Sequence, residues 1–398
     1  MKRKFTKMVV LFLVTALLLS ISGCAQNAET KASSESPSNG DTPETAITDI
    51  KLEFAKNFNV QYFSNGMKIV TDAMGNKMLL LNEGQTAPIK FDDLPTVTIP
   101  LQNTVYTSTT QVGYLRAFND DALFDSISGV RLTADEWDFD AMKSRMLNGK
   151  IVDIGSNTAM TTTYDHEIIQ SLNPNLLFLT GGGMNADIEK LVGMLDQSNI
   201  PYLIDGSSGE DDYRGTMEWI KFFAAFYNLD QEAETYFEEA MSRIDEVVAK
   251  TKDQPKPKVG WAIVAMGKAY VEDAGSKSAK MIRAAGAEYL FDGIGDDTNS
   301  VTNITIEELY ELLSKGDILI NRGMPKYGPD KKSITDQAPA LAELEIFAQD
   351  RVWQITDNFW NSYHNIDKKY LELAAIFHPD LFPDVEFENF ILMPDVAQ

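Results

Sequence analysis

Two runs of alternating strands and helices, separated by one long helix, constrain the fold of this chain most strongly. The first run has predicted strands at 150–155, 176–179 and 201–204, with helices at 165–172 and 186–197. The second has predicted strands at 259–264, 317–320 and 352–355, with helices at 278–285, 305–313, 340–348 and 368–377. Strands separated by helices form βαβ units, so each run predicts a mostly parallel sheet.

The helix between the runs is amphipathic and long. Apolar residues recur every three or four positions from Ala233 to Val248, and the pattern stops before Pro255. About 20 residues at 1.5 Å each give roughly 30 Å, enough to cross a lobe. We therefore expect an α/β fold of two Rossmann-like lobes joined by one backbone helix, with a ligand site between the lobes. The expected segments are an N-terminal lobe at 96–210, connecting helices at 211–253 and a C-terminal lobe at 254–398.

A small β-meander is predicted before the first lobe, at 51–95. Residues 60–63 and 67–71 flank Ser64-Asn65-Gly66, and a Gly75-Asn76 turn leads to 78–81. Asn-Gly between alternating segments is a strong hairpin signal. A further strand is expected at 97–100, continuing towards Tyr106 in the first lobe.

The N-terminal residues predict export and lipid anchoring. Four basic residues within 2–7 precede an apolar run at 8–21, which has the layout of a secretory signal at 1–23. Ser22-Gly23 precedes Cys24, the sole cysteine, as in a lipobox, so lipidation is expected at Cys24 and no disulfide is available to the mature chain. The alternative is a plain signal peptide. Residues 24–50 are polar, which predicts a disordered tether. Together, the signal, Cys24 and the tether predict an extracytoplasmic protein that is lipid-anchored to the cell membrane.

The chain is strongly acidic, with 35 basic and 59 acidic residues and a net charge of −24. Without the four basic residues of the signal, 31 basic residues remain against 59 acidic ones, which gives about −28. Such a charge argues against binding to nucleic acid or anionic lipid.

Four local sequences resemble a known family in their order and spacing. They are "GKIVDIGSNTAMTTTYDHEIIQSLNPNLLFL" (149–179), "SAKMIRAAGAEYLF" (278–291), "TIEEL" with "GDILI" (305–320), and "DRVWQIT" with "LAAIFHPDLFP" (350–383). Together they resemble the substrate-binding lipoproteins of ABC importers for iron complexes, siderophores and cobalamin, which are the helical-backbone class of periplasmic binding proteins. The resemblance covers roughly 96–383; the β-meander resembles an extension of some members.

The resemblance implies a monomeric receptor that delivers a metal chelate to an ABC permease and its ATPase. In this family a glutamate on each lobe docks onto arginines of the permease. The matching residues are Glu167 and Glu307, with Glu308 as the neighbouring alternative. A pair of acidic groups whose spacing depends on lobe closure distinguishes a loaded receptor from an empty one. The alternative is two ordinary solvated charges near helix N-termini.

Ligand-binding residues are expected, by analogy, on the loops after strands. Aromatic side chains supply apolar walls for a chelate such as a siderophore, haem or cobalamin, and a few cations match its negative groups. Arg322 is the strongest candidate cation, and Glu210, Tyr213 and Arg214 are expected near the mouth. The full set is Tyr106, Thr107, Ser108, Ser156, Asn157, Gly182, Gly183, Met184, Asn185, Met266, Lys268, Arg322, Tyr327, Phe359, Trp360 and Tyr363.

The histidines do not predict a bare-metal site. His166, His364 and His378 are the only three, none is paired at helical spacing with another histidine, and no cluster of acidic residues supplies a closed zinc or manganese site. The metal is therefore expected to arrive inside its chelator, and no resident cofactor is expected. His364 lies near Trp360 and Tyr363 and is an alternative axial ligand for haem or a corrinoid.

Two other functions stay open. Gly181-Gly182-Gly183-Met184-Asn185-Ala186 follows a strand and opens a helix, and Asp205 ends the next strand, which together match a dinucleotide-binding fingerprint. An oxidoreductase is therefore the main alternative, although no nucleophile motif is present and an enzyme is not expected. A surface adhesin is the third class.

Overall fold

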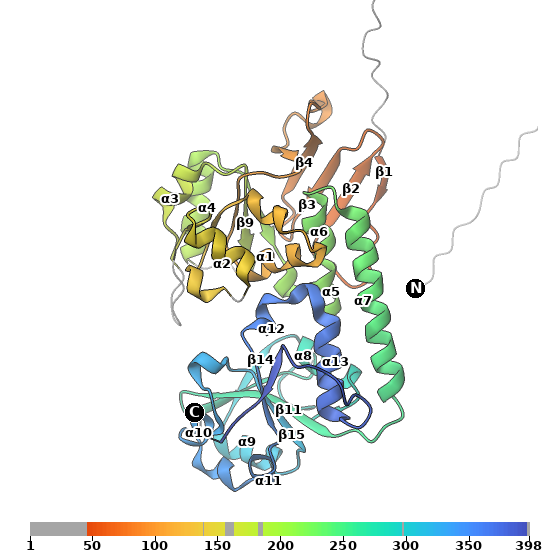
Figure 1. Ribbon diagram of the computed structural model, residues 1–398, viewed down its shortest axis with the longest axis vertical. Coiled ribbons are helices and arrows are strands. Elements are labelled where there is room, and N and C mark those ends of the chain that lie inside the picture. Colours follow the sequence, from red (N-terminus) through yellow and green to blue (C-terminus); the bar gives the residue numbers. More distant parts are fainter. Residues whose placement is uncertain (1–45, 138, 156–162, 182–185, 297, 396–398) are drawn as a thin grey trace, which may run out of the picture. The chain divides into compact units, whose positions relative to one another are not determined.

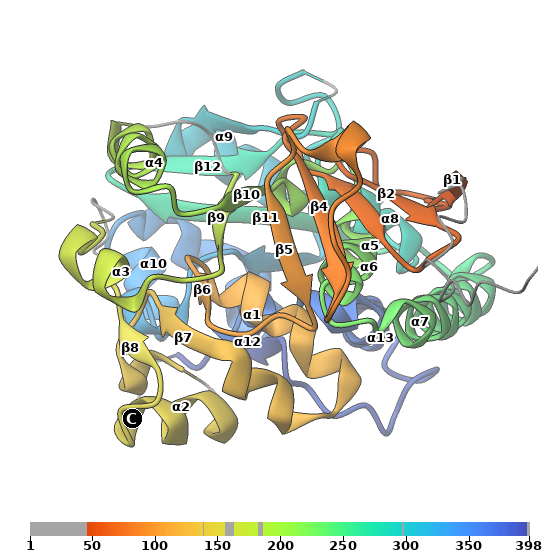
Figure 2. The ribbon, with the colours of Figure 1, turned by 90° about the horizontal axis from the view of Figure 1, so that it is seen from above.

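The computed structural model describes residues 46–395 except 138, 156–162, 182–185 and 297. The N-terminal lobe (Figure 1) contains a five-stranded sheet in the order β10-β9-β6-β7-β8, with every pair parallel. Figure 2 labels all five strands. Its strands are β6 (Thr104–Tyr106), β7 (Ile127–Val130), β8 (Val152–Asp153), β9 (Leu176–Thr180) and β10 (Tyr202–Asp205). Its helices are α1 (Thr109–Leu115), α2 (Asp140–Leu147), α3 (His166–Leu172) and α4 (Ala186–Ser198). The predicted parallel α/β lobe is confirmed.

The C-terminal lobe has a seven-stranded sheet in the order β14-β12-β11-β15-β16-β17, with β13 beside β11. The strands are β11 (Lys258–Ala265), β12 (Lys268–Glu272), β13 (Glu288–Tyr289), β14 (Val301–Ile304), β15 (Ile318–Asn321), β16 (Val352–Ile355) and β17 (Phe390–Leu392). β11, β15 and β16 are parallel, whereas β12, β14 and β17 run antiparallel to their neighbours. The sequence prediction missed these three outer strands.

Helices of the C-terminal lobe are α8 (Lys277–Ala284), α9 (Ile306–Leu313), α10 (Lys331–Thr335), α11 (Glu345–Ala348), α12 (Asn358–Asn361) and α13 (Ile366–Phe377). The helix predicted at 340–348 is divided: a 3₁₀ segment covers Pro339–Glu343, and α11 begins after the extended Leu344.

Three helices connect the lobes: α5 (Tyr213–Glu218), α6 (Ile220–Ala225) and α7 (Asp230–Thr251). α7 is the predicted long helix, and its 22 residues correspond to roughly 33 Å. It buries Phe237, Ala240 and Ile244 and contacts both α6 and α13. No helix within the described part of the chain is long and apolar enough to cross a membrane.

The N-terminal extension is a five-stranded sheet in the order β1-β2-β3-β4-β5. Its strands are β1 (Ala46–Asp49), β2 (Asn59–Phe63), β3 (Lys68–Thr71), β4 (Lys77–Asn82) and β5 (Thr96–Ile99). β1 lies within the predicted tether, and β5 pairs in parallel with β4, so the strand expected at 97–100 belongs to the extension and not to the first lobe. Pro100 has no N–H to continue the ladder, and the chain enters the other sheet at Thr104.

Buried carboxylates attach the extension to the connecting helices. Glu218 accepts hydrogen bonds from the backbone N–H groups of Glu53, Phe54 and Ala55 at 2.8–2.9 Å, and from Lys221 at 3.1 Å. Glu210 accepts from the N–H groups of the next two residues, 56 and 57, at 3.0–3.1 Å. Because an ionised acceptor makes stronger hydrogen bonds, these two side chains fix the loop before β2.

Candidate functional site

The N-terminal half of the candidate site lies where β6 and β9 end. The Thr107 hydroxyl donates to the carbonyl of Phe178 at 3.0 Å and accepts from the N–H of Thr180 at 3.0 Å. Ser108 caps α1, and its side chain accepts from the N–H of Thr110. Neighbouring carboxyl ends of a parallel sheet are thereby held together by side-chain hydrogen bonds, which is the expected place for a ligand in this fold class.

The C-terminal half carries charged side chains. Arg322 follows β15, and its Nη1 lies 3.6 Å from the carboxylate of Glu272 at the end of β12. Glu272 and Arg322 are both close enough to Tyr213 and Tyr363 to act on the pKa of these phenols, although burial is the larger cause of the raised pKa of each. An ion pair of this kind beside aromatic rings suits a large, partly polar ligand.

α12 and α1 bring the two lobes into direct contact. The Thr110 hydroxyl donates to the carbonyl of Trp360 at 3.1 Å. A Cβ at Gly113 would lie 2.5 Å from the carbonyl oxygen of Asn361, so only glycine permits this approach. The Tyr213 ring meets the Phe359 ring edge-on at 5.9 Å. The lobe junction is therefore a packed interface with little room for longer side chains.

Lys277 forms a second, buried link across the junction. It is the first residue of α8, and its ammonium donates to the carbonyl of Ser208 at 2.8 Å. Burial lowers the pKa of Lys277 to about 8, opposed by the carboxylates of Glu272 and Glu210. Burial also raises the pKa of Asp205, which Lys277 partly offsets. The junction thus combines hydrogen bonds, rings and partly neutralised charges.

Several predicted ligand residues lie together at this junction. Thr107 and Ser108 lie at the end of β6, and Trp360 contacts α1 through its carbonyl. Arg322 lies close enough to Tyr213 and Tyr363 to act on the pKa of both, and Glu272 partly compensates its charge.

Other predicted ligand residues are corrected by their positions. Tyr106 and Phe359 are fully buried and Tyr363 nearly so, because all three pack in the core; Tyr106 stacks on Phe178 and its hydroxyl bonds to Tyr227. Met266 is 82% exposed in the turn between β11 and β12, and the exposed Lys268 bonds to Asn303.

The positions of Tyr327 and of the three residues expected near the mouth of the ligand site also differ from the prediction. Tyr327 is 63% exposed and borders a cavity of about 50 Å³, which is too small for a chelate. Glu210 is buried against the 53–57 loop, and Tyr213 is buried between the lobes. Arg214 pairs with Asp212 at 2.9 Å and covers the ring of Phe54.

Some predictions lie outside the described residues: Cys24, Ser156, Asn157, Gly182, Gly183, Met184 and Asn185. Sequence reasoning did not predict that Glu272 and Lys277 lie at the lobe junction. A signal existed for Lys277, because a cation is unfavourable in the first turn of a helix and needs another reason to stand there.

Gly181 and Asp205, the parts of the dinucleotide fingerprint that the structure describes at its two ends, have structural roles; residues 182–185 lie outside the described part of the chain. Asp205, which would have to reach a ribose hydroxyl, is buried and accepts from the N–H of Ser207 at 2.9 Å. A Cβ at Gly181 would lie 2.5 Å from the carbonyl oxygen of Asp205, so this glycine is explained by strand packing. The local pattern therefore follows from how β9 and β10 approach each other.

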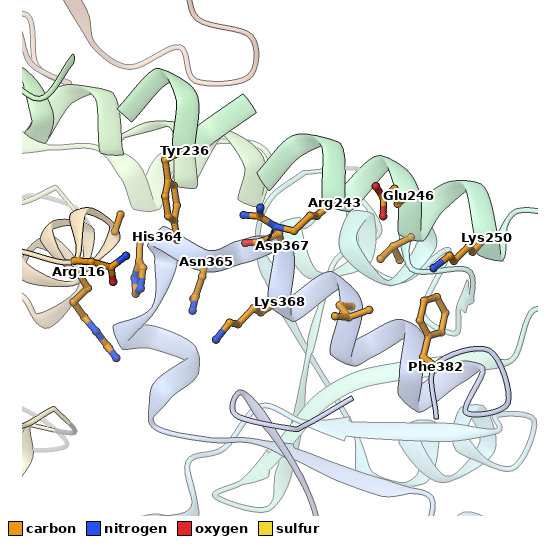
Figure 3. A pocket seen from close by; sticks show the side chains of 14 residues that line it. Arg116, Tyr236, Arg243, Glu246, Lys250, His364, Asn365, Asp367, Lys368 and Phe382 are labelled. Carbon is orange, nitrogen blue, oxygen red and sulfur yellow. Dashed lines mark hydrogen bonds and ion pairs between the residues drawn. The ribbon is translucent and has the colours of Figure 1, made fainter. Parts of the chain in front are cut away.

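Two of the histidines, His364 and His378, are buried. His378 is buried, with Nε2 3.0 Å from the carbonyl of Gly286. His364 is 6% exposed and borders a different cavity from the strand ends (Figure 3). Among the described residues, no cluster of three or more histidine, cysteine or acidic side chains could hold a metal ion.

Glu167 and Glu307 occupy equivalent positions on the two lobes. Each is the second residue of its helix, α3 or α9. The preceding caps are Asp165, which accepts from the N–H of Ile168 at 3.0 Å, and Thr305, which accepts from the N–H of Glu308 at 3.1 Å. Both glutamates are exposed, and neither forms an ion pair with another described residue.

Comparisons with known proteins agree with this architecture. The sequence profile described as "Periplasmic binding protein" matches residues 105–358. An uncharacterised lipoprotein of Methanocaldococcus jannaschii is 28% identical, over 96% of this chain and 94% of its own.

Solved structures show the same fold at low sequence identity. A periplasmic heme-binding protein from Pseudomonas aeruginosa is 16% identical and has a TM-score of 0.55, covering 75% of this chain and 98% of its own. An iron-uptake ABC-transporter substrate-binding protein from Streptococcus pneumoniae is 16% identical with a TM-score of 0.51, covering 69% and 93%. The profile match covers more than half of the chain, which therefore belongs to the periplasmic binding protein family.

Proposed function

We propose that this protein is the lipid-anchored receptor of an ABC importer, that it binds a metal chelate between its lobes, and that Glu167 and Glu307 dock it onto the permease. The observation that carries the proposal is the equivalent placement of these two glutamates, one on each lobe, at the same position of a capped helix. A receptor that touches its partner through both lobes reports whether they are closed.

The surroundings of the two glutamates support docking over a purely helical role. A carboxylate in the first turn is favourable for any helix, by about 0.3–1 kcal/mol. The capping acceptor is already supplied by Asp165 in one helix and by Thr305 in the other. The carboxylates of Glu167 and Glu307 are therefore not needed as caps and are exposed to a partner that carries arginines.

A chelated metal is a better candidate ligand than a bare ion. No described cluster of side chains offers a set of metal ligands, so the metal would have to arrive already coordinated. Ser108 and Trp360 are partly exposed and offer a polar and an aromatic group, and the partly exposed guanidinium of Arg322 beside Glu272 offers hydrogen-bond donors. The names of two structural relatives, a heme-binding protein and an iron-uptake protein, point to the same class of ligand.

The lipid anchor is proposed from the sequence that precedes residue 46 and from the name of a relative. Cys24 follows a signal-like segment, and a relative of nearly the same length is named a lipoprotein. Lipidation at Cys24 would hold the receptor at the extracytoplasmic face of the membrane, where it could dock onto the permease. Metabolic labelling with a radioactive fatty acid, lost in Cys24→Ala, tests this part alone.

Binding is tested by titrating the mature chain with ferric hydroxamate, ferric catecholate, haem and cyanocobalamin and following tryptophan fluorescence. We expect saturable binding of at least one chelate, at about one equivalent, with a Kd below about 10 µM. Arg322→Gln should weaken an anionic chelate about tenfold, whereas Lys326→Gln, at an exposed site, should not. Tight binding of NADH would support the enzyme, and binding only to a macromolecule would support an adhesin; both outcomes contradict the proposal.

A further inference from the structure

A short segment, residues 206–212, carries the chain from the N-terminal lobe into the connecting helices, and we call it the crossing segment. It follows β10, which ends at Asp205, and it ends at Asp212, the residue that caps α5. α5 lies beside α8 of the C-terminal lobe (Figure 1, Figure 2). A movement of the N-terminal lobe relative to α8 must therefore change the contacts of the crossing segment.

The side chains of the crossing segment bind the N-terminal extension. The carboxylate of Glu210 accepts from the backbone N–H groups of Lys56 and of the next residue at 3.0–3.1 Å. Asp211 pairs with the ammonium of Lys56 at 2.8 Å. A Cβ at Gly206 would lie 2.3 Å from the Cβ of Ala73, so the backbone of the crossing segment also packs directly on the extension.

The extension in turn is bound to the edge of the N-terminal sheet. The buried carboxylate of Asp72 accepts from the N–H of Ile204 in β10 at 2.8 Å. The N–H of Ala73 donates to the carbonyl of the same residue at 3.4 Å. The sheet, the extension and the crossing segment are therefore held together as one body.

The backbone carbonyls of the crossing segment face the C-terminal lobe instead. Three side chains of that lobe donate to them: Lys277 to Ser208 at 2.8 Å, Asn299 to Glu210 at 3.2 Å and Lys280 to Asp211 at 2.6 Å. Asn299 also accepts from the N–H of Lys277 at 3.1 Å, which orients its amide to donate to the crossing segment. Donors from α8 and from the loop before β14 thus meet carbonyls within residues 208–211.

The two sides of the crossing segment differ in what is lost when their contacts break. Glu210 and Glu218 are 1% and 0% exposed, so a movement of the extension would leave two buried carboxylates without their hydrogen-bond donors. On the other side, Asn299 is exposed and Lys280 is partly exposed, so water can replace the carbonyls as their partners. Lys277 is the buried one of the three donors. Separation of the lobes is therefore easier on the side of α8.

We propose that Lys277, Lys280 and Asn299 form a latch that holds the C-terminal lobe against the crossing segment. When the lobes separate, these three donors leave the carbonyls of residues 208–211, while the extension keeps the crossing segment on the N-terminal lobe. The latch sets the spacing of the lobes before any ligand binds. It therefore also sets the distance between Glu167 and Glu307, which lie on different lobes.

Spin labels on the two lobes test the latch in the mature chain without added ligand. Cys24 is the sole cysteine, so Cys24→Ala leaves two introduced cysteines as the only labelling sites: Lys190→Cys in α4 and Glu343→Cys in the C-terminal lobe, both at exposed positions. Double electron–electron resonance then measures the distribution of distances between the labels. Lys277→Met combined with Asn299→Ala should add a population that is at least about 5 Å longer than the distance in the chain with an intact latch.

The matched control makes the same two substitutions at a lysine–asparagine hydrogen bond elsewhere in the C-terminal lobe. Lys268 in β12 donates to Asn303 in β14 at 3.3 Å, and both residues are exposed. Lys268→Met combined with Asn303→Ala should leave the distance distribution unchanged. The same lengthening in this control would overturn the proposal.

A second latch variant keeps the test decisive if loss of the buried Lys277 impairs folding, which circular dichroism detects. Lys280→Gln combined with Asn299→Ala changes only the two solvent-accessible donors, and it should also add the longer population. An unchanged distance distribution in a folded latch variant would overturn the proposal. Neither result depends on a chelate or on the permease, so the latch and the proposed function can fail separately.

Discussion

The carboxylate of Glu308 accepts hydrogen bonds from both the backbone N–H of Thr305, at 2.8 Å, and its hydroxyl, at 3.1 Å. Since Thr305 in turn accepts from the N–H of Glu308, the two residues form a complete capping box at the start of α9. Glu308 is thus used within the helix, whereas the exposed carboxylate of Glu307 forms no ion pair with another described residue. The structure separates the two adjacent glutamates that the sequence alone leaves as alternatives.

This separation predicts different defects for the two glutamates. Glu307→Gln should reduce stimulation of the cognate transporter's ATPase by about fivefold to tenfold, because a charge that meets an arginine is lost. Glu308→Gln should lower the free energy of unfolding by about 1 kcal/mol and leave stimulation near normal. Reconstituted transporter and urea denaturation supply the two measurements. The reverse pattern would assign docking to Glu308.

Glu218 is expected to be a major source of stability for the extension. Glu218→Gln replaces one acceptor oxygen with an NH₂ group that faces the backbone N–H groups of residues 53–55, and it also breaks the pair with Lys221. The free energy of unfolding should fall by about 3 kcal/mol. Glu238→Gln, at an exposed position of α7, is the control and should change it by less than about 0.5 kcal/mol. A small effect of Glu218→Gln would show that the 53–57 loop holds without it.

Gly113 controls how closely α1 approaches α12. Gly113→Ala would place a methyl group 2.5 Å from the carbonyl oxygen of Asn361, so the helices must separate. We expect a loss of about 1–3 kcal/mol in the free energy of unfolding and a change in the small-angle scattering curve as the lobes move apart. Gly193→Ala in α4 meets no atom within 4 Å and should be neutral or slightly stabilising. Identical behaviour of the two variants would mean that the lobe contact is not tight in solution.

Lys277 should make stability depend on pH above neutrality. Its folded pKa of about 8 lies below the ordinary value of 10.5, because burial disfavours the charged form. Between these values the unfolded chain binds more protons than the folded one, so the free energy of unfolding rises with pH. Lys277→Met should remove this rise between pH 8 and 9.5, a window below the ordinary pKa of tyrosine.

Urea denaturation of Lys277→Met and the native chain at three pH values within that window measures the two slopes. Because a single group is removed, the difference between the slopes reports Lys277 directly. Equal slopes would contradict a buried, partly deprotonated lysine at the lobe junction.

Sequence reasoning located the lobes because their central strands are buried on both faces. Leu176 to Leu179 is a continuous apolar run, which is typical of a strand that is covered on both faces, and it is fully buried in β9. The strands that were missed are short or have irregular patterns: β7 contains Gly129, and Val301 and Asn303 in β14, and Ile391 in β17, are exposed. The strand at 97–100 was assigned to the wrong sheet because pairing with β4 leaves no local signal.

The site was less predictable, because a sequence indicates where a strand ends but not the direction of each side chain. Tyr106 is the last residue of β6 and was expected to face a ligand, yet its hydroxyl bonds to Tyr227 in the core at 2.8 Å. The contact between Thr110 and Trp360 joins residues 250 positions apart, and no periodicity can reveal it. By contrast, the helix starts that carry Glu167 and Glu307 were predicted correctly, since helix starts have local signals.

The central claim, that this receptor carries a metal chelate, is tested most directly by native mass spectrometry of the mature protein. The protein is incubated with ferric hydroxamate, ferric catecholate, haem and cyanocobalamin together, with NADH as a competitor, and then desalted. We predict one complex of protein and a single intact chelate at one-to-one stoichiometry, with its metal retained. A spectrum that shows only the NADH complex, or no chelate bound at ligand concentrations of about 100 µM, would contradict the account.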